Sequence, residues 1–76
     1  MAVGNVHADL SRPGQAIRAL MERVQAEYVE MPGLSVTLPQ AQRLWAVDQT
    51  MCEEVFSRLI STGVLRRTSK GRFIRA

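Results

Sequence analysis

The sequence predicts a single small α+β domain that is mostly α, with three helices followed by a C-terminal β-hairpin. Two observations predict the helices: apolar residues recur at three- and four-residue steps, and helix-capping residues stand at the ends of these repeats. A third observation, two short strand-like runs around a glycine-containing turn, predicts the hairpin. The length of 76 residues suits one domain, and the 46% hydrophobic content is typical of a folded chain.

The first helix is predicted from Gly14 to about Met31. Its apolar residues fall within an arc of about 100°, the stripe of a helix that packs on a core. Pro32 and Gly33 then end the helix, because proline cannot continue the hydrogen-bond ladder. Two alternatives stay open for the end of the stripe, where Tyr28 and Met31 either close the core or form part of a dimer seam. The stripe consists of Ile17, Leu20, Met21, Val24, Tyr28 and Met31.

The second helix is predicted to begin after Thr37 and to end at the turn formed by residues 46–48. Residues 34–37 alternate apolar and polar side chains, which indicates a short strand or an extended connector. Thr37 and Gln40 have the spacing of a capping box, and proline is tolerated in the first turn of a helix. We expect one face of this helix to carry Leu38, Ala41, Leu44 and Trp45.

The third helix is predicted over residues 49–62. Asp48 is suited to be its N-cap, because a carboxylate can accept from the free N–H groups of the first turn. Gly63 follows in the position of a C-terminal stop. A buried arc is expected from Cys52, Val55, Phe56, Leu59 and Ile60.

Positive charge is concentrated at the end of the chain, in the predicted hairpin of residues 64–75. Residues 64–76 hold five of the ten basic residues and no acid, whereas the rest of the chain has five arginines against seven acids. A basic segment on a mildly acidic body favours an anionic partner. The basic residues are Arg66, Arg67, Lys70, Arg72 and Arg75.

The order of these elements resembles the winged helix-turn-helix family over residues 14–76. Residues 37–45 are similar to the family's positioning helix, and residues 48–63 are similar to its recognition helix. Residues 64–67 together with residues 71–75 are similar to its wing. The resemblance implies a winged helix-turn-helix fold over these residues. Residues 1–13 show no sustained periodicity, so we expect them to form a flexible tail.

The same resemblance implies a DNA-binding protein, a small bacterial-type transcription regulator or accessory factor. The sequence contains no motif for a cofactor, so we expect none. The recognition helix would enter the major groove of duplex DNA, and the wing would lie on the backbone. The implied contacts are Gln49, Thr50, Glu53 and Ser57 on the helix, and Arg66, Arg67, Lys70 and Arg72 on the wing. Because specific binding usually combines half-sites, we also expect a homodimer or a larger protein partner.

Adjacent acids on the recognition helix keep a second hypothesis open. Glu53 and Glu54 stand where a reader of guanine would present arginine, and carboxylates near phosphates are costly. Glu53 can still accept from cytosine, and Gln49 can pair with adenine. The alternative is a winged helix that binds another protein and makes no direct contact with DNA.

No arrangement of residues predicts catalysis or metal binding. The lone His7 lies in the predicted tail, so no Ser–His–Asp set or metal cluster is formed around it. Cys52 is expected in the core, and Trp45 is expected on the inner face of its helix. No secretory signal or membrane-spanning stretch is predicted, so we expect a soluble cytoplasmic protein without a small-molecule substrate.

Overall fold

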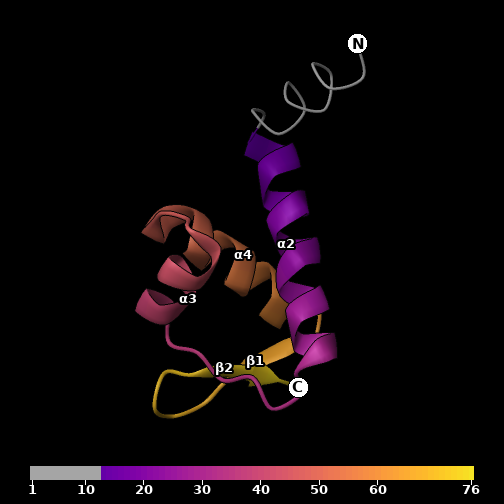
Figure 1. Cartoon of the computed structure of the whole chain (residues 1–76), viewed down its shortest axis with the longest axis vertical. Helices are drawn as coiled ribbons and strands as arrows, with labels where there is room; N and C mark the ends of the chain where they lie inside the picture. The colour runs from indigo at the N-terminus through magenta and orange to yellow at the C-terminus, as the bar shows by residue number, and fades with distance from the viewer. Residues whose placement is uncertain (1–12) are drawn as a thin grey trace.

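The computed structural model describes residues 13–76, which form three helices and one antiparallel hairpin (Figure 1). The helices are α2 (Pro13–Glu30), α3 (Leu38–Trp45) and α4 (Gln49–Ser61), and the strands are β1 (Leu65–Arg67) and β2 (Phe73–Arg75). The domain is therefore α+β and mostly helical, as predicted. The predicted tail and His7 lie outside the described residues, except that Pro13 already belongs to α2.

Helix α2 packs along α4 through the apolar stripe that the sequence predicts. Leu20, Val24 and Tyr28 are buried, whereas Val29 on the opposite side is 72% exposed. The prediction that Met31 is the last residue of this stripe is wrong, since Met31 follows the end of α2 and is 45% exposed. Tyr28, by contrast, closes the core.

The connector between α2 and α3 joins the hairpin as a third, very short antiparallel element. Val36 forms a bridge with Phe73, in which each residue donates its backbone N–H to the other's carbonyl, at 3.3 and 2.7 Å. The side chain of Val36 is buried. The connector therefore ties the start of α3 to β2.

Helix α3 begins with the predicted capping box. The Thr37 hydroxyl accepts from the Gln40 N–H, and the Gln40 side chain accepts from the Thr37 N–H. The helix ends at Ala46, which adopts the left-handed conformation with φ of 54°. The prediction that Leu44 lies on the inner face of α3 is wrong, since its side chain is 51% exposed. The covered side of α3 carries Ala41 and Trp45.

Helix α4 follows its predicted N-cap, as an Asp48 carboxylate oxygen accepts from the Met51 N–H at 2.7 Å. Gly63, just after the helix, has φ of 81°, a conformation that glycine adopts without strain. The prediction that Ile60 is buried is wrong, since Ile60 lies at the edge of the arc beside the hairpin and is 37% exposed.

The hairpin register sets which side chains share a face. Leu65 pairs with Arg75, Arg66 with Ile74, and Arg67 with Phe73. Because cross-strand partners lie on the same face and successive residues alternate, Arg67 shares the core-facing side with Phe73, and Arg66 lies on the other side with Ile74.

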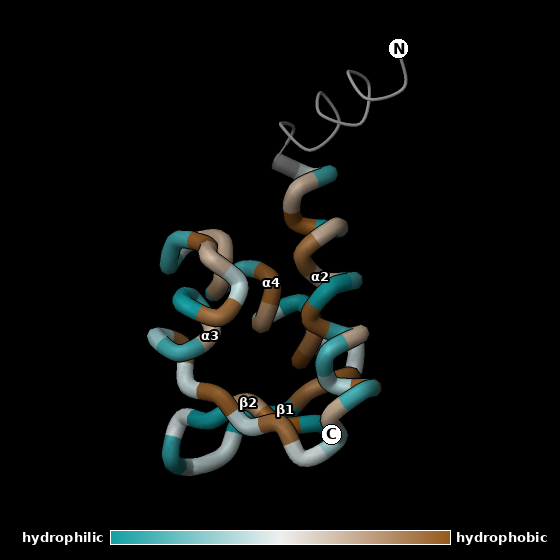
Figure 2. Tube along the Cα trace, in the orientation of Figure 1, coloured by the Kyte–Doolittle hydropathy of each residue, from teal (hydrophilic) through white to brown (hydrophobic). Residues whose placement is uncertain are grey.

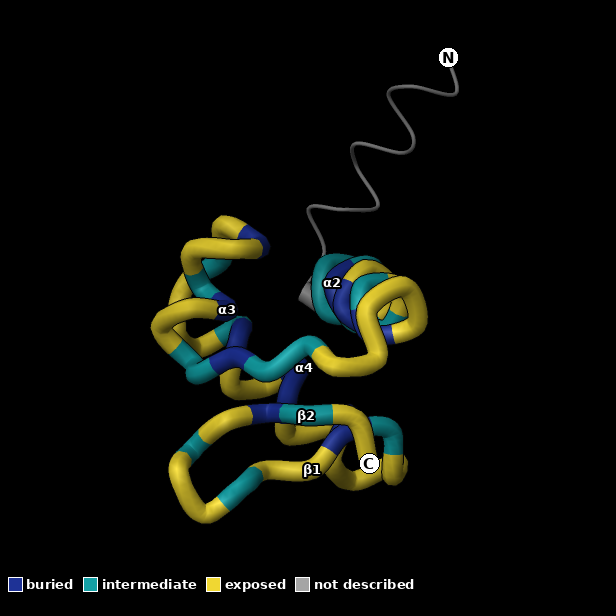
Figure 3. Tube along the Cα trace, turned by 60° about the horizontal axis from the view of Figure 1, so that its bottom comes forward, coloured by how far each residue is buried: buried dark blue, intermediate teal, exposed yellow. Residues whose placement is uncertain are grey.

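The core lies between the three helices and the hairpin. The Phe56 ring is its centre, with ring centroids 6.0 Å from Trp45 and 4.6 Å from Phe73. Figure 2 shows the apolar stretches of the helices and strands turned toward this interior, and Figure 3 shows buried residues there. The loop that joins β1 to β2 extends away from the core and is mostly exposed (Figure 3).

Within residues 13–76, no helix combines the length and the apolar character that crossing a membrane requires.

Candidate nucleic-acid interface

All four residues predicted for the recognition helix are exposed on α4. Glu53 and Ser57 face the hairpin, where they line a groove together with Arg67. Gln49 belongs with this side because its amide donates to the Glu53 carboxylate at 2.9 Å. Thr50 instead lines a groove toward α2 that includes Ile17. Thr50 and Ser57 are seven residues apart, about two helical turns, so the four side chains still share the outward side of α4.

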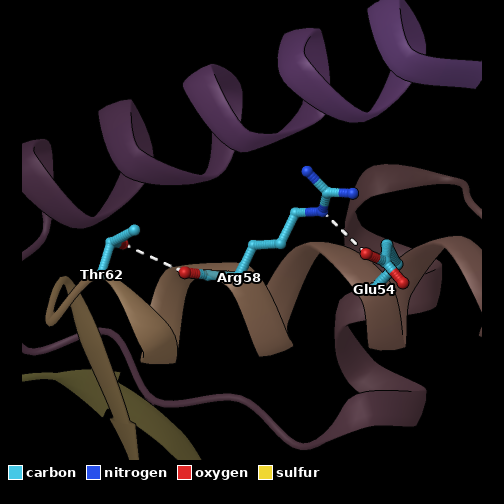
Figure 4. Close-up of polar contacts among 3 residues, drawn as sticks. All are labelled: Glu54, Arg58 and Thr62. Carbon is cyan, nitrogen blue, oxygen red and sulfur yellow. Dashed lines mark hydrogen bonds and ion pairs between the residues drawn. The ribbon is translucent and has the colours of Figure 1, made fainter.

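The second acid of α4, Glu54, points to the α2 side and is paired. Arg58, one turn further on, donates its Nε to a Glu54 carboxylate oxygen at 2.7 Å (Figure 4). Both side chains are about half exposed, so the ion pair adds little to stability. Arg58 nevertheless compensates the negative charge of Glu54, one of the two acids that would repel DNA phosphates from α4. The i,i+4 spacing of Glu54 and Arg58 was the signal in the sequence for this pair.

The predicted cations of the hairpin lie on different sides of it. The Arg67 guanidinium lies 5.8 Å from the centre of the Phe73 ring, beside α4. Arg66 lies on the opposite face of the hairpin, as the register requires. Arg72 donates its Nη1 to the Ser35 carbonyl at 3.4 Å, which directs it toward the connector. Lys70 is exposed in the loop between the strands.

The loop between β1 and β2 is held in one conformation by its own hydrogen bonds. The Thr68 hydroxyl accepts from the N–H groups of Lys70 and Arg72, at 3.3 and 3.1 Å. Gly71 has φ of 76°, where a side chain would be strained. These bonds hold the backbone at Lys70 and Arg72, while the charged end of Lys70 makes no hydrogen bond within the described residues.

A groove of about 290 Å³, which we call the hairpin groove, separates α4 from the hairpin. Its floor is apolar, because Phe56 and Phe73 reach it from the core and Ile60 from its edge. Glu53 and Arg67, of opposite charge, are among its walls. Sequence reasoning missed the apolar part of this site, since Ile60 had the spacing of a core residue. Its full lining is Leu38, Glu53, Phe56, Ser57, Ile60, Arg67, Gly71 and Phe73.

Ion pairing distinguishes the hairpin cations from Arg58. In residues 13–76, the pair of Glu54 and Arg58 is the single contact between opposite charges within 4.0 Å. No carboxylate of the described chain therefore neutralises Arg66, Arg67, Lys70 or Arg72. Unpaired cations on a surface favour an anionic ligand, because they attract it without first giving up an existing partner.

Cys52 and Trp45 have the structural roles that the sequence predicts. Cys52 is fully buried on the inner side of α4, and Trp45 is 4% exposed against Phe56. Burial raises the pKa of the Cys52 thiol, and the nearby carboxylates of Glu53 and Asp48 raise it further. A buried thiol with a raised pKa is a poor nucleophile, so Cys52 contributes to packing rather than to chemistry.

Comparisons of the chain with protein-family models, with curated proteins and with solved structures gave no match. Residues 13–76 by themselves define an α+β domain of three helices, with an antiparallel hairpin in the segment of residues 64–76 that holds five of the chain's ten basic residues.

Proposed function

We propose that this protein is a winged helix-turn-helix module that binds duplex DNA, as a small transcription regulator or an accessory factor. In this proposal α4 lies toward the major groove, and the hairpin lies on the sugar–phosphate backbone. The observation that carries the proposal is the set of hairpin cations, which make no ion pair among residues 13–76 and of which Arg67 lies beside α4. Contacts of such cations with phosphates release counterions, and this supplies affinity for any DNA sequence.

The acids of α4 are compatible with this proposal in different ways. Glu54 is compensated by Arg58, and Glu53 accepts a hydrogen bond from Gln49. A Gln–Glu pair on a helix can donate to and accept from base edges in the major groove. Duplex DNA therefore meets hydrogen-bonding groups along α4 and uncompensated positive charge on the hairpin.

The experiment that tests the proposal is a fluorescence-anisotropy titration of a labelled, mixed-sequence duplex at several salt concentrations. With about three to four phosphates contacted, the slope of log K against log salt should be near −3, at about −0.9 per contact. Arg23→Gln is a matched control, because Arg23 is an exposed cation on α2 that lines neither the hairpin groove nor the grooves between α2 and α4. We expect it to leave the slope unchanged.

The hairpin groove favours a second candidate function, the binding of a protein partner. Its apolar floor and the 37% exposed Ile60 suit a partner's apolar side chain, and Glu53 suits a basic one. This candidate predicts no DNA binding at about 50 mM salt, where phosphate contacts are strongest. Such a result, from a chain whose helicity is confirmed by circular dichroism, would contradict the DNA proposal.

A homodimer or a larger protein partner belongs to the DNA proposal. One module offers a single recognition helix, whereas specific binding usually combines two half-sites. Sedimentation equilibrium with and without DNA measures this directly. We expect two chains per specific site, and a single chain bound per site would contradict the homodimer.

A further inference from the structure

A second groove lies on the side of α4 that faces away from the hairpin. We call it the α2 groove; its volume is about 500 Å³, and its lining includes two cations and no carboxylate. Arg18 reaches it from α2 and Arg58 from α4. The complete lining is Gly14, Gln15, Ile17, Arg18, Met21 and Arg58.

Arg58 has hydrogen-bond donors left beside its pair with Glu54. Its Nε donates to Glu54, and Figure 4 shows the two terminal nitrogens directed toward α2. Within the described part of the chain, these nitrogens donate no further hydrogen bond. A guanidinium in this state can give its remaining N–H groups to a phosphate oxygen pair.

Arg18 has no carboxylate within 4.0 Å among residues 13–76 and is exposed. Two carboxylates, Asp48 and Glu54, line the adjoining groove at the start of α4. Asp48 caps the helix by accepting from the Met51 N–H, and Glu54 accepts from Arg58. The charged residues that line the α2 groove itself are both cations, Arg18 and Arg58.

We propose that Arg18 and Arg58 form a second phosphate contact, so that α4 is flanked by cations on both sides. This inference rests on the proposed DNA binding. It adds a contact with the second DNA strand, whose sugar–phosphate backbone lies across the major groove from the hairpin. The major groove is about 12 Å wide, and a helix with its side chains is about 10–12 Å across. A helix in that groove consequently has phosphates along each of its two sides. The hairpin cations would contact one DNA strand, and Arg18 and Arg58 would contact the other.

The test is the salt dependence of DNA binding for Arg18→Gln, Arg58→Gln and the double variant. Each lost contact should make the slope of log K against log salt shallower by about 0.9, and the double variant's slope shallower by about 1.8. When the salt concentration is raised from about 50 to 200 mM, the Kd of both proteins increases. The factor of increase should be about 12 times smaller for the double variant than for the parent protein.

Two further variants separate a phosphate contact from a structural effect. Arg58→Lys keeps the positive charge and should keep most of the slope, whereas Arg23→Gln removes an α2 cation outside the groove and should keep all of it. If the parent binds DNA with its steep slope and the double variant shows that same slope, the inference is overturned while DNA binding stands. If the parent does not bind DNA, the proposed function itself has failed.

Discussion

The phenolic hydroxyl of Tyr28 donates a 2.6 Å hydrogen bond to the backbone carbonyl of Phe73, 45 residues further along the chain. The same carbonyl accepts from the Val36 N–H at 3.3 Å. One oxygen atom in β2 thus joins the end of α2, the connector and the hairpin. The hairpin is thereby fixed relative to the helices, and its cations are fixed relative to α4.

Replacement of Tyr28 with phenylalanine should destabilise the domain without unfolding it. Tyr28→Phe keeps the buried ring but removes the donor, and a hydrogen bond of this kind contributes about 1 kcal/mol to the free energy of unfolding. Phe73 retains its contact with Val36, so its carbonyl is not left unpaired. Urea denaturation followed by circular dichroism measures the change, and a variant as stable as the parent would show that the bond contributes nothing.

Titration of Tyr28 should depend on folding. Burial raises the pKa of Tyr28 to about 12 from its usual value of 10. The raised pKa favours the neutral phenol in the folded state, so this contribution to stability is complete below pH 10 and is lost as the pH rises toward 12. Tyr28 is the only tyrosine in the chain, so tyrosinate absorbance reports it alone.

The unfolded chain provides the reference for that titration. In concentrated urea the absorbance should change near pH 10, and in buffer it should change at a higher pH. Coincident curves would show that Tyr28 is not buried in solution. In the Tyr28→Phe variant, the loss of stability between pH 10 and 12 should be smaller than in the parent.

The left-handed residue at the end of α3 offers a route to a more stable domain. Ala46 has φ of 54° and is exposed, and an L-residue with a side chain pays roughly 1–2 kcal/mol for this conformation. Ala46→Gly removes that cost, partly offset by the greater freedom of glycine in the unfolded chain. We therefore expect an increase of about 0.5–1 kcal/mol in the free energy of unfolding.

Gly63 allows the reverse substitution as a matched control. Its φ of 81° is also left-handed, and a Cβ added there would have no neighbouring atom within 4 Å beyond the adjacent residues. Gly63→Ala should lower stability by about 1 kcal/mol through backbone strain alone. Thermal or urea unfolding of both variants checks the pair. Equal stability of Ala46→Gly and the parent would mean that the turn relaxes in solution.

Arg66 and Arg67 should differ in their effect on DNA binding, although they are neighbours in sequence. Arg67 lies beside α4 in the hairpin groove, whereas Arg66 lies on the other face of the hairpin. Arg67→Gln should make the salt slope shallower by about 0.9, and Arg66→Gln should change it less. A larger effect of Arg66→Gln would place the DNA on the outer face of the hairpin instead.

Local signals in the sequence were sufficient to predict the helices and their ends. The capping box of Thr37 and Gln40, the N-cap at Asp48 and the stop at Gly63 are all confirmed. Each depends on residues within one turn of the helix end, so neighbours in sequence supply all the atoms involved. The hairpin was equally predictable, although its register was not.

Contacts between distant residues were decided only by the tertiary structure. The pairing of Val36 with Phe73 and the division of α4 into two flanks depend on which elements pack together, and periodicity carries no such information. Leu44 and Ile60 have the spacing of core residues, yet both lie beyond the surface that their neighbours cover. The sequence by itself determined the elements and the basic hairpin. Packing decided which charges face α4, because a side chain's surroundings are set by elements far away in the chain.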